Sequence, residues 1–210
     1  MTKRYAIAAS AAMAAILSGS VYFAFVDGAE VSFVECRATK AVAGESSIGG
    51  PFALVDKVGR TVSDRDVFEK PSLLYFGYTY CPDICPLDVL RNAEAADALT
   101  AKGYDVTPVF VTVDPERDTP EVVGDFASNM HPNMIGLTGS LDQVKDAADA
   151  YKVFFKRHES EDEFYLVDHT TFTYLVLPEH GFVEFFRRRE TPEELALRTS
   201  CFIDSASRIG

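Results

Sequence analysis

The sequence predicts an α/β domain with a right-handed crossover between buried strands and a β-hairpin near the C-terminus. After residue 50, strand-forming runs alternate with segments of helical periodicity, which is the order typical of layered α/β folds. The 210 residues suit one domain with additional segments, and 47% apolar with 25% charged residues is typical of a globular protein.

The first half of this domain predicts a hairpin and two buried strands joined by a helix. The segment Phe52–Val62 has short strand-like runs around a glycine, which indicates a hairpin. Ser72–Phe76 is apolar without alternation, as in a strand covered on both faces. Apolar residues at every third position in Leu87–Lys102, ended by Gly103, predict a helix, and Val106–Val113 is the second buried strand.

The second half predicts three helices and a terminal hairpin. Thr119 and Thr191 each precede a proline, a pattern that favours a capped helix start. Leu141–Phe155 has apolar residues on one helical face. Tyr165–Leu177 is rich in strand formers, and Phe182–Arg187 follows a turn and is expected to pair back with it.

The N-terminus predicts a membrane anchor. Lys3 and Arg4 precede the charge-free run Tyr5–Val26, which as a helix spans ~33 Å, enough for the hydrocarbon core. Acidic Asp27 and Glu30 follow, so we expect a cytoplasmic N-terminus and a domain in the periplasm or an equivalent extracytoplasmic space. A cleaved signal peptide is the alternative. The predicted organisation is an anchor over 1–26, a tether over 27–50 and a domain over 51–205.

The composition argues against nucleic acid as a partner. Lys and Arg number 20 against 32 Asp and Glu, so the formal charge of −12 repels phosphate backbones. Four cysteines are too few for a disulfide-rich scaffold, so each needs its own interpretation.

Cys81 and Cys85 lie between a predicted buried strand and the following helix, where α/β folds present ligands. Pro82 and Pro86 suit the first turn of that helix, and Asp83 is a candidate to cap it. Helical geometry would place the two Cα atoms ~6 Å apart, within the range of a disulfide. The positive helix end lowers a thiol pKa, and thiolates are soft ligands that suit Cu(I).

A structural disulfide and a zinc site are alternatives for this pair. A bridge across so short a loop constrains the unfolded chain little, and a structural zinc site needs four ligands. A third copper ligand would be a histidine. His131, His158 and His180 are interpreted as solvated surface residues. His169 instead opens a strand-like run, where it is either a ligand or a hydrogen-bonded edge residue.

The segments that contain Cys81, Cys85 and His169, together with two segments between them, resemble the Sco/SenC family of membrane-anchored, thioredoxin-like copper proteins that assist cytochrome c oxidase assembly. The resemblance implies a thioredoxin-like fold, with a central mixed sheet flanked by helices and with N-terminal and C-terminal hairpins. It also implies one copper ion, Cu(I) or Cu(II), bound by Cys81, Cys85 and His169. The acceptor that it implies is the binuclear copper centre of cytochrome c oxidase subunit II. The matching segments are Tyr80–Pro86, Val113–Pro120, Gly136–Gly139 and Val167–Thr170.

The cysteine pair also allows other functions. A Cys81–Cys85 disulfide cannot act as two thiolates, so metal loading needs a thiol reductant, and an upstream copper donor is a second expected partner. A thiol–disulfide oxidoreductase that reduces the acceptor cysteines, or a redox or copper sensor, is the alternative to a metallochaperone. Asp168 is a candidate to orient His169, although adjacent strand residues point to opposite faces.

Cys36 and Cys201 remain outside this constellation. Both have apolar neighbours that suit burial, and leftover cysteines in an oxidising compartment often pair. Our hypothesis is a structural Cys36–Cys201 disulfide that fastens the tether to the last helix.

Overall fold

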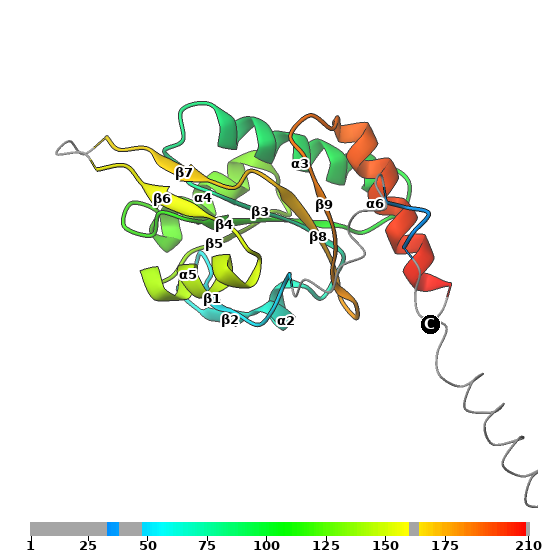
Figure 1. The fold of residues 1–210 in the computed structure, drawn as a ribbon, viewed down its shortest axis with the longest axis horizontal. Coiled ribbons are helices and arrows are strands. Elements are labelled where there is room, and N and C mark those ends of the chain that lie inside the picture. The colour runs from blue at the N-terminus through cyan, green and yellow to red at the C-terminus, as the bar shows by residue number, and fades with distance from the viewer. Residues whose placement is uncertain (1–32, 38–47, 160–163, 209–210) are drawn as a thin grey trace, which may run out of the picture.

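The computed structural model describes residues 33–37, 48–159 and 164–208, and Figure 1 shows their arrangement. The predicted anchor and most of the predicted tether lie outside the described residues. Within the three described ranges, no helix has the length and apolar character needed to cross a membrane. The elements are β1 (Ala53–Val55), β2 (Thr61–Ser63), α2 (Asp64–Val67), β3 (Ser72–Gly77), α3 (Ile84–Thr100), β4 (Thr107–Thr112), α4 (Pro120–Met130), β5 (Ile135–Leu137), α5 (Leu141–Ala150), β6 (Phe155–Arg157), β7 (Val167–His169), β8 (Thr173–Leu177), β9 (Gly181–Phe186) and α6 (Pro192–Ser207).

A mixed five-stranded sheet with the order β5-β4-β3-β8-β9 forms the centre of the domain. β3, β4 and β5 are parallel, whereas β8 pairs antiparallel with β3, and β9 antiparallel with β8. In Figure 1, α3 and α6 lie on one side of the sheet, and α5 with the β1–β2 hairpin on the other. The mixed sheet, its flanking helices and its two hairpins confirm the predicted fold. All six residues of β3 are buried, as its apolar run predicts.

Local side chains explain where most helices begin. Thr119, Ser140 and Thr191 each accept a hydrogen bond from a backbone N–H in the first turn of α4, α5 and α6. Asp83 occupies the cap position of α3 but makes no such hydrogen bond, so its predicted capping role is wrong. The Cys81 sulfur accepts one of these amide hydrogen bonds instead, from the N–H of Cys85.

Two predicted elements differ from the structure. α5 ends at Ala150, short of the predicted residue 155, because Lys152 adopts a left-handed backbone with φ of 56° that a helix cannot continue through. The strand predicted over 165–177 divides at 170–172 into β7 and β8. β7 leaves the central sheet and pairs with β6 in a two-stranded ribbon. His169 is the last residue of β7 and therefore belongs to this two-stranded ribbon and not to the central sheet.

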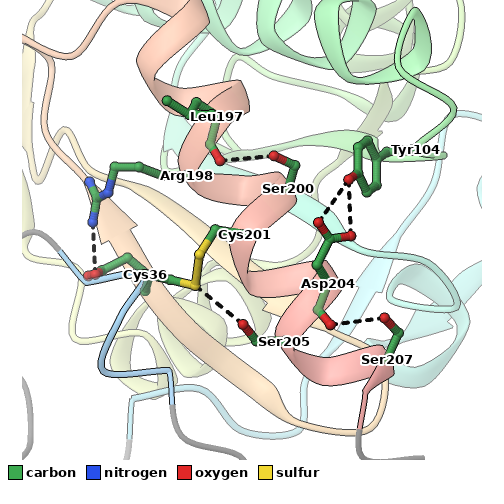
Figure 2. The surroundings of a disulfide bond; sticks show 10 residues. Cys36, Tyr104, Leu197, Arg198, Ser200, Cys201, Asp204, Ser205 and Ser207 are labelled. Atoms are coloured by element: carbon green, nitrogen blue, oxygen red, sulfur yellow. Dashed lines mark hydrogen bonds and ion pairs between the residues drawn. A yellow bond between two sulfur atoms is a disulfide. The ribbon is translucent and has the colours of Figure 1, made fainter.

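A disulfide and a small apolar cluster fasten the N-terminal segment to α6. Cys36 and Cys201 are bonded across a sequence separation of 165 residues (Figure 2). The Phe33 ring packs against Phe202, with ring centroids 5.2 Å apart. Residues 33–37 fall within the predicted tether, but they are held against the domain.

Candidate metal centre

The β3–α3 junction carries both cysteines of the predicted site. Cys81 lies in the loop after β3, and Cys85 is the second residue of α3. Both are free thiols, with Cys81 9% exposed and Cys85 fully buried. Gly77 ends β3, and a Cβ there would lie 2.9 Å from the Tyr75 ring and 3.2 Å from Cys85 Sγ. The absence of a side chain at Gly77 lets the Cys85 sulfur pack against the end of the strand.

The two sulfurs occupy different electrostatic environments. Burial acts to raise the pKa of Cys81, but hydrogen bonds from the backbone N–H groups of Asp83, Cys85 and Ile84 outweigh it and lower that pKa. The Cys85 N–H donates to Cys81 Sγ at 3.3 Å. Burial raises the pKa of the Cys85 thiol, and the neighbouring Cys81 adds to this increase. Cys81 is therefore the sulfur that more readily forms a thiolate.

The structure brings His169 to Cys85 from 84 residues further along the chain. Its Nε2 lies 3.2 Å from Cys85 Sγ, and its Nδ1 lies 3.0 Å from the carbonyl oxygen of Thr170. A carbonyl only accepts hydrogen bonds, so the Thr170 contact favours the tautomer with the proton on Nδ1 and a lone pair on Nε2. Burial lowers the pKa of His169, which favours the neutral, metal-binding form.

Aromatic rings fix the orientation of this imidazole. The Tyr75 and Tyr78 rings meet His169 edge-on, with centroid distances of 6.1 and 5.9 Å. The Tyr75 hydroxyl donates to Asp88, a buried carboxylate in α3 that also receives a hydrogen bond from Arg188. Burial raises the pKa of Tyr78 to about 12. Residue type and spacing did not point to Tyr75, Tyr78 or Asp88, and only their closeness in sequence to the cysteine motif could have suggested them.

The three candidate ligands are only partly assembled. Cys85 and His169 already face each other, whereas Cys81 Sγ accepts hydrogen bonds from helix amides. Across the described part of the chain, no three His, Cys, Asp or Glu side chains are arranged closely enough to hold a metal ion. Two sulfurs and one unprotonated imidazole nitrogen nevertheless form a soft donor set of the kind that suits Cu(I).

Two predictions about polar neighbours are wrong. Asp168 does not contact the His169 ring, because its side chain lies on the opposite face of β7 and pairs with His158 at 2.8 Å. His131 is buried and not solvated. Its Nε2 lies 3.2 Å from Asp97, and its Nδ1 accepts a hydrogen bond from the Asn133 N–H.

The fold and the site together define a thioredoxin-like domain with two free thiols and a neighbouring imidazole at the first strand–helix junction of its central sheet. The SCO1/SenC family model matches residues 40–204, and the chain belongs to this family. A SenC protein of Rhodobacter capsulatus is 46% identical over 209 residues, which cover 100% of this chain and 94% of that protein. The mitochondrial SCO1 homolog 1 of Arabidopsis thaliana is 44% identical over 154 residues, covering 73% of this chain and 46% of that protein.

Solved structures agree with the fold over most of the described residues. The crystal structure of Arabidopsis thaliana ScoI with copper bound has a TM-score of 0.72 and 42% identity, covering 75% of this chain and 98% of that one. Bradyrhizobium japonicum ScoI, also solved with copper bound, has a TM-score of 0.67 and 37% identity, covering 74% of this chain and 99% of that one.

Proposed function

We propose that this protein binds one copper ion through Cys81, Cys85 and His169 and delivers it to the binuclear copper centre of cytochrome c oxidase subunit II. The observation that carries the proposal is the 3.2 Å approach of His169 Nε2 to Cys85 Sγ, with the Nδ1 proton engaged by a carbonyl. The copper-bound structures of two relatives support the choice of metal. A further relative is described as a member of the Sco family of cytochrome c oxidase assembly proteins, which supports cytochrome c oxidase as the enzyme that receives the copper.

In this proposal, copper is cargo and its transfer is a ligand exchange. Cys85 and His169 provide the already facing pair, and Cys81, which shares a side-chain hydrogen bond with Cys85, completes the ligand set. Three protein ligands leave a coordination position open, so a thiolate or imidazole of the acceptor can bind before the donor ligands dissociate. Both cysteines must be reduced for loading, which makes the thiol redox state the switch for metal uptake.

Copper affinity tests the ligand set. The reduced full-length protein should bind about one copper, and His169→Ala should weaken binding by more than ~10-fold through loss of a ligand. Competition with a colorimetric Cu(I) chelator measures this. His158→Ala is the matched control, because this imidazole is half exposed, pairs with Asp168 and should leave the affinity unchanged. An unchanged affinity in His169→Ala would refute the ligand set.

A copper-transfer assay tests the acceptor. Protein loaded with Cu(I) and mixed in more than twofold excess with the reduced, copper-free soluble domain of subunit II should transfer two copper ions to each acceptor, measured as the copper content of the acceptor after the two proteins are separated. Failure of transfer by a protein that binds copper normally would refute the delivery step alone.

The electrostatics of the cysteine pair favour one second candidate, a thiol–disulfide oxidoreductase. The Cys81 thiolate would attack an acceptor disulfide, release one acceptor thiolate and form a mixed disulfide. Cys85 would then attack Cys81 Sγ, leaving a Cys81–Cys85 disulfide and two acceptor thiols. This activity needs no imidazole, so His169→Ala would retain it while losing copper.

We further propose that residues 1–26 anchor the protein with its domain outside the cytoplasm. The uncharged run between basic and acidic flanks supports this topology. Alkaline phosphatase is active only outside the cytoplasm, so an alkaline phosphatase fused after residue 210 should be active. An inactive fusion that remains in the cytoplasm would refute this topology.

A further inference from the structure

We propose that Arg117 is a positioning residue that holds the loop before Cys81 and the segment before His169 at a fixed separation. This role rests on the proposed copper function and deepens it. Arg117 lies between β4 and α4, outside both ligand-bearing segments. It is 36 positions after Cys81 and 52 before His169 in the numbered chain.

The Arg117 guanidinium contacts both segments. On the cysteine side, its central carbon lies 4.9 Å from the Tyr80 ring centroid and 5.8 Å from that of Tyr78. On the histidine side, the same carbon lies 3.6 Å from the Tyr165 ring centroid, and one terminal nitrogen donates to the Tyr165 carbonyl at 3.0 Å. One planar cation therefore joins the residue before Cys81 to a residue four positions before His169.

A buried carboxylate holds the guanidinium in place. Arg117 Nε donates to Asp114 Oδ2 at 2.6 Å, and the Tyr165 hydroxyl donates to Asp114 Oδ1 at 2.7 Å. The Arg117 side chain is only 13% exposed and that of Asp114 5%. The Arg117 guanidinium is hydrogen-bonded to Asp114 and contacts the Tyr80 and Tyr165 rings, so this side chain has few accessible rotamers. The distance that it sets between the loop before Cys81 and the segment before His169 is therefore well defined.

The ribbon that carries His169 depends on such contacts. β6 and β7 form a separate two-stranded sheet, and an isolated two-stranded hairpin is marginally stable by itself. The position of His169 is therefore decided by side chains that dock the ribbon onto the domain. Arg117 also touches Tyr78, whose ring meets His169 edge-on. Loss of the guanidinium should loosen the histidine relative to the cysteines without removing any ligand.

A double-mutant cycle tests this role. Arg117→Lys keeps a positive charge beside Asp114, so the fold is retained, but it lacks the planar fork that stacks and donates at once. Competition with a Cu(I) chelator is carried out on the reduced full-length wild type, Arg117→Lys, His169→Ala and the double variant. We expect Arg117→Lys to weaken copper binding roughly threefold or more in the wild type, and by less than about twofold when His169 is already replaced.

Arg198→Lys is the matched control. The Arg198 guanidinium also stacks on an aromatic ring, with its central carbon 4.8 Å from the Phe186 centroid, and pairs with the buried Glu184, but it lies in α6 and not on the ribbon. This variant should leave copper affinity within about twofold of the wild type. Urea unfolding of both lysine variants measures their stabilities alongside.

The outcomes separate the two proposals. Equal weakening by Arg117→Lys with and without His169, or no weakening at all, would overturn the positioning role while the copper site stands. An equal loss in Arg198→Lys would also overturn it, because a general effect of replacing a stacked, ion-paired arginine would then explain the result. A wild-type affinity in His169→Ala would overturn the ligand set and this role together.

Discussion

Asp118 shows how one buried side chain shapes the loop before Cys81. Its carboxylate accepts hydrogen bonds from the Thr79 N–H and hydroxyl and from the Thr112 hydroxyl, at 2.5 to 3.0 Å. Thr79 is two residues before Cys81, so Asp118 anchors the loop that presents the first cysteine. Burial raises the pKa of Asp118, although the threonine hydrogen bonds oppose this effect.

The raised pKa predicts a pH-dependent stability. The unfolded carboxyl ionises near pH ~4, and the folded one at higher pH. Its contribution is therefore fully present below pH ~4 and is lost as the pH rises through the folded pKa. The difference in unfolding free energy between wild type and Asp118→Asn should shift in favour of the wild type as the pH falls from 7 to 4. Urea unfolding at a series of pH values measures this difference.

Asp66 provides a control of opposite sign. Its exposed carboxylate accepts hydrogen bonds from the Ser63 hydroxyl and N–H, and these lower its pKa. The difference between wild type and Asp66→Asn should therefore shrink as the pH falls. The same trend for both variants would contradict the assignment for Asp118.

At the scale of elements, the packing of α4 on β5 depends on one glycine. A Cβ at Gly136 would lie 2.5 Å from the Val123 carbonyl oxygen and 2.9 Å from a Val123 side-chain carbon. The contact is with helix backbone, so it cannot be relieved by rotating a side chain. Gly136→Ala should destabilise the protein by about 1–3 kcal/mol through overpacking.

Thermal and urea unfolding of Gly136→Ala measure this cost. Gly50→Ala is the control, since a Cβ there would lie 3.5 Å from Ala150 Cβ, an ordinary van der Waals distance. Equal unfolding midpoints for the two variants would mean that α4 moves away from β5 without cost.

Helices and strands differed in how well local patterns predicted them. α4 and α6 begin at the predicted positions because a proline and a capping threonine act locally, whereas α3 begins near its predicted position without a side-chain cap. The strand over 165–177 was predicted as one element because strand-forming residues continue through it. It divides because β7 pairs with β6 and β8 with β3, and a residue's strand propensity does not specify its partner.

At the scale of the whole molecule, the Cys36–Cys201 disulfide joins the two ends of the described chain. Because the bridge spans 165 residues, breaking it releases much conformational freedom in the unfolded state. The double variant Cys36→Ser/Cys201→Ser should be less stable than the oxidised wild type by about 2–4 kcal/mol.

Urea unfolding with and without reductant checks this value. The reductant should lower the midpoint of the wild type but leave that of the double serine variant unchanged, because Cys81 and Cys85 are already free thiols. A midpoint shift of equal size in both proteins would show that the bridge contributes nothing.

Residue identity and spacing by themselves determined the α/β fold class and the strand–helix junction of Cys81 and Cys85, and the family resemblance of the sequence singled out His169 as a candidate ligand. These follow from local propensity and from a motif whose chemistry depends on residue type. Only the tertiary structure decided that His131 is buried, that His158 is the partner of Asp168, and that Arg117 contacts both Tyr80 and Tyr165. Strand alternation predicted that Asp168 points away from His169, but contacts between segments tens of residues apart are set by packing, which no local pattern encodes.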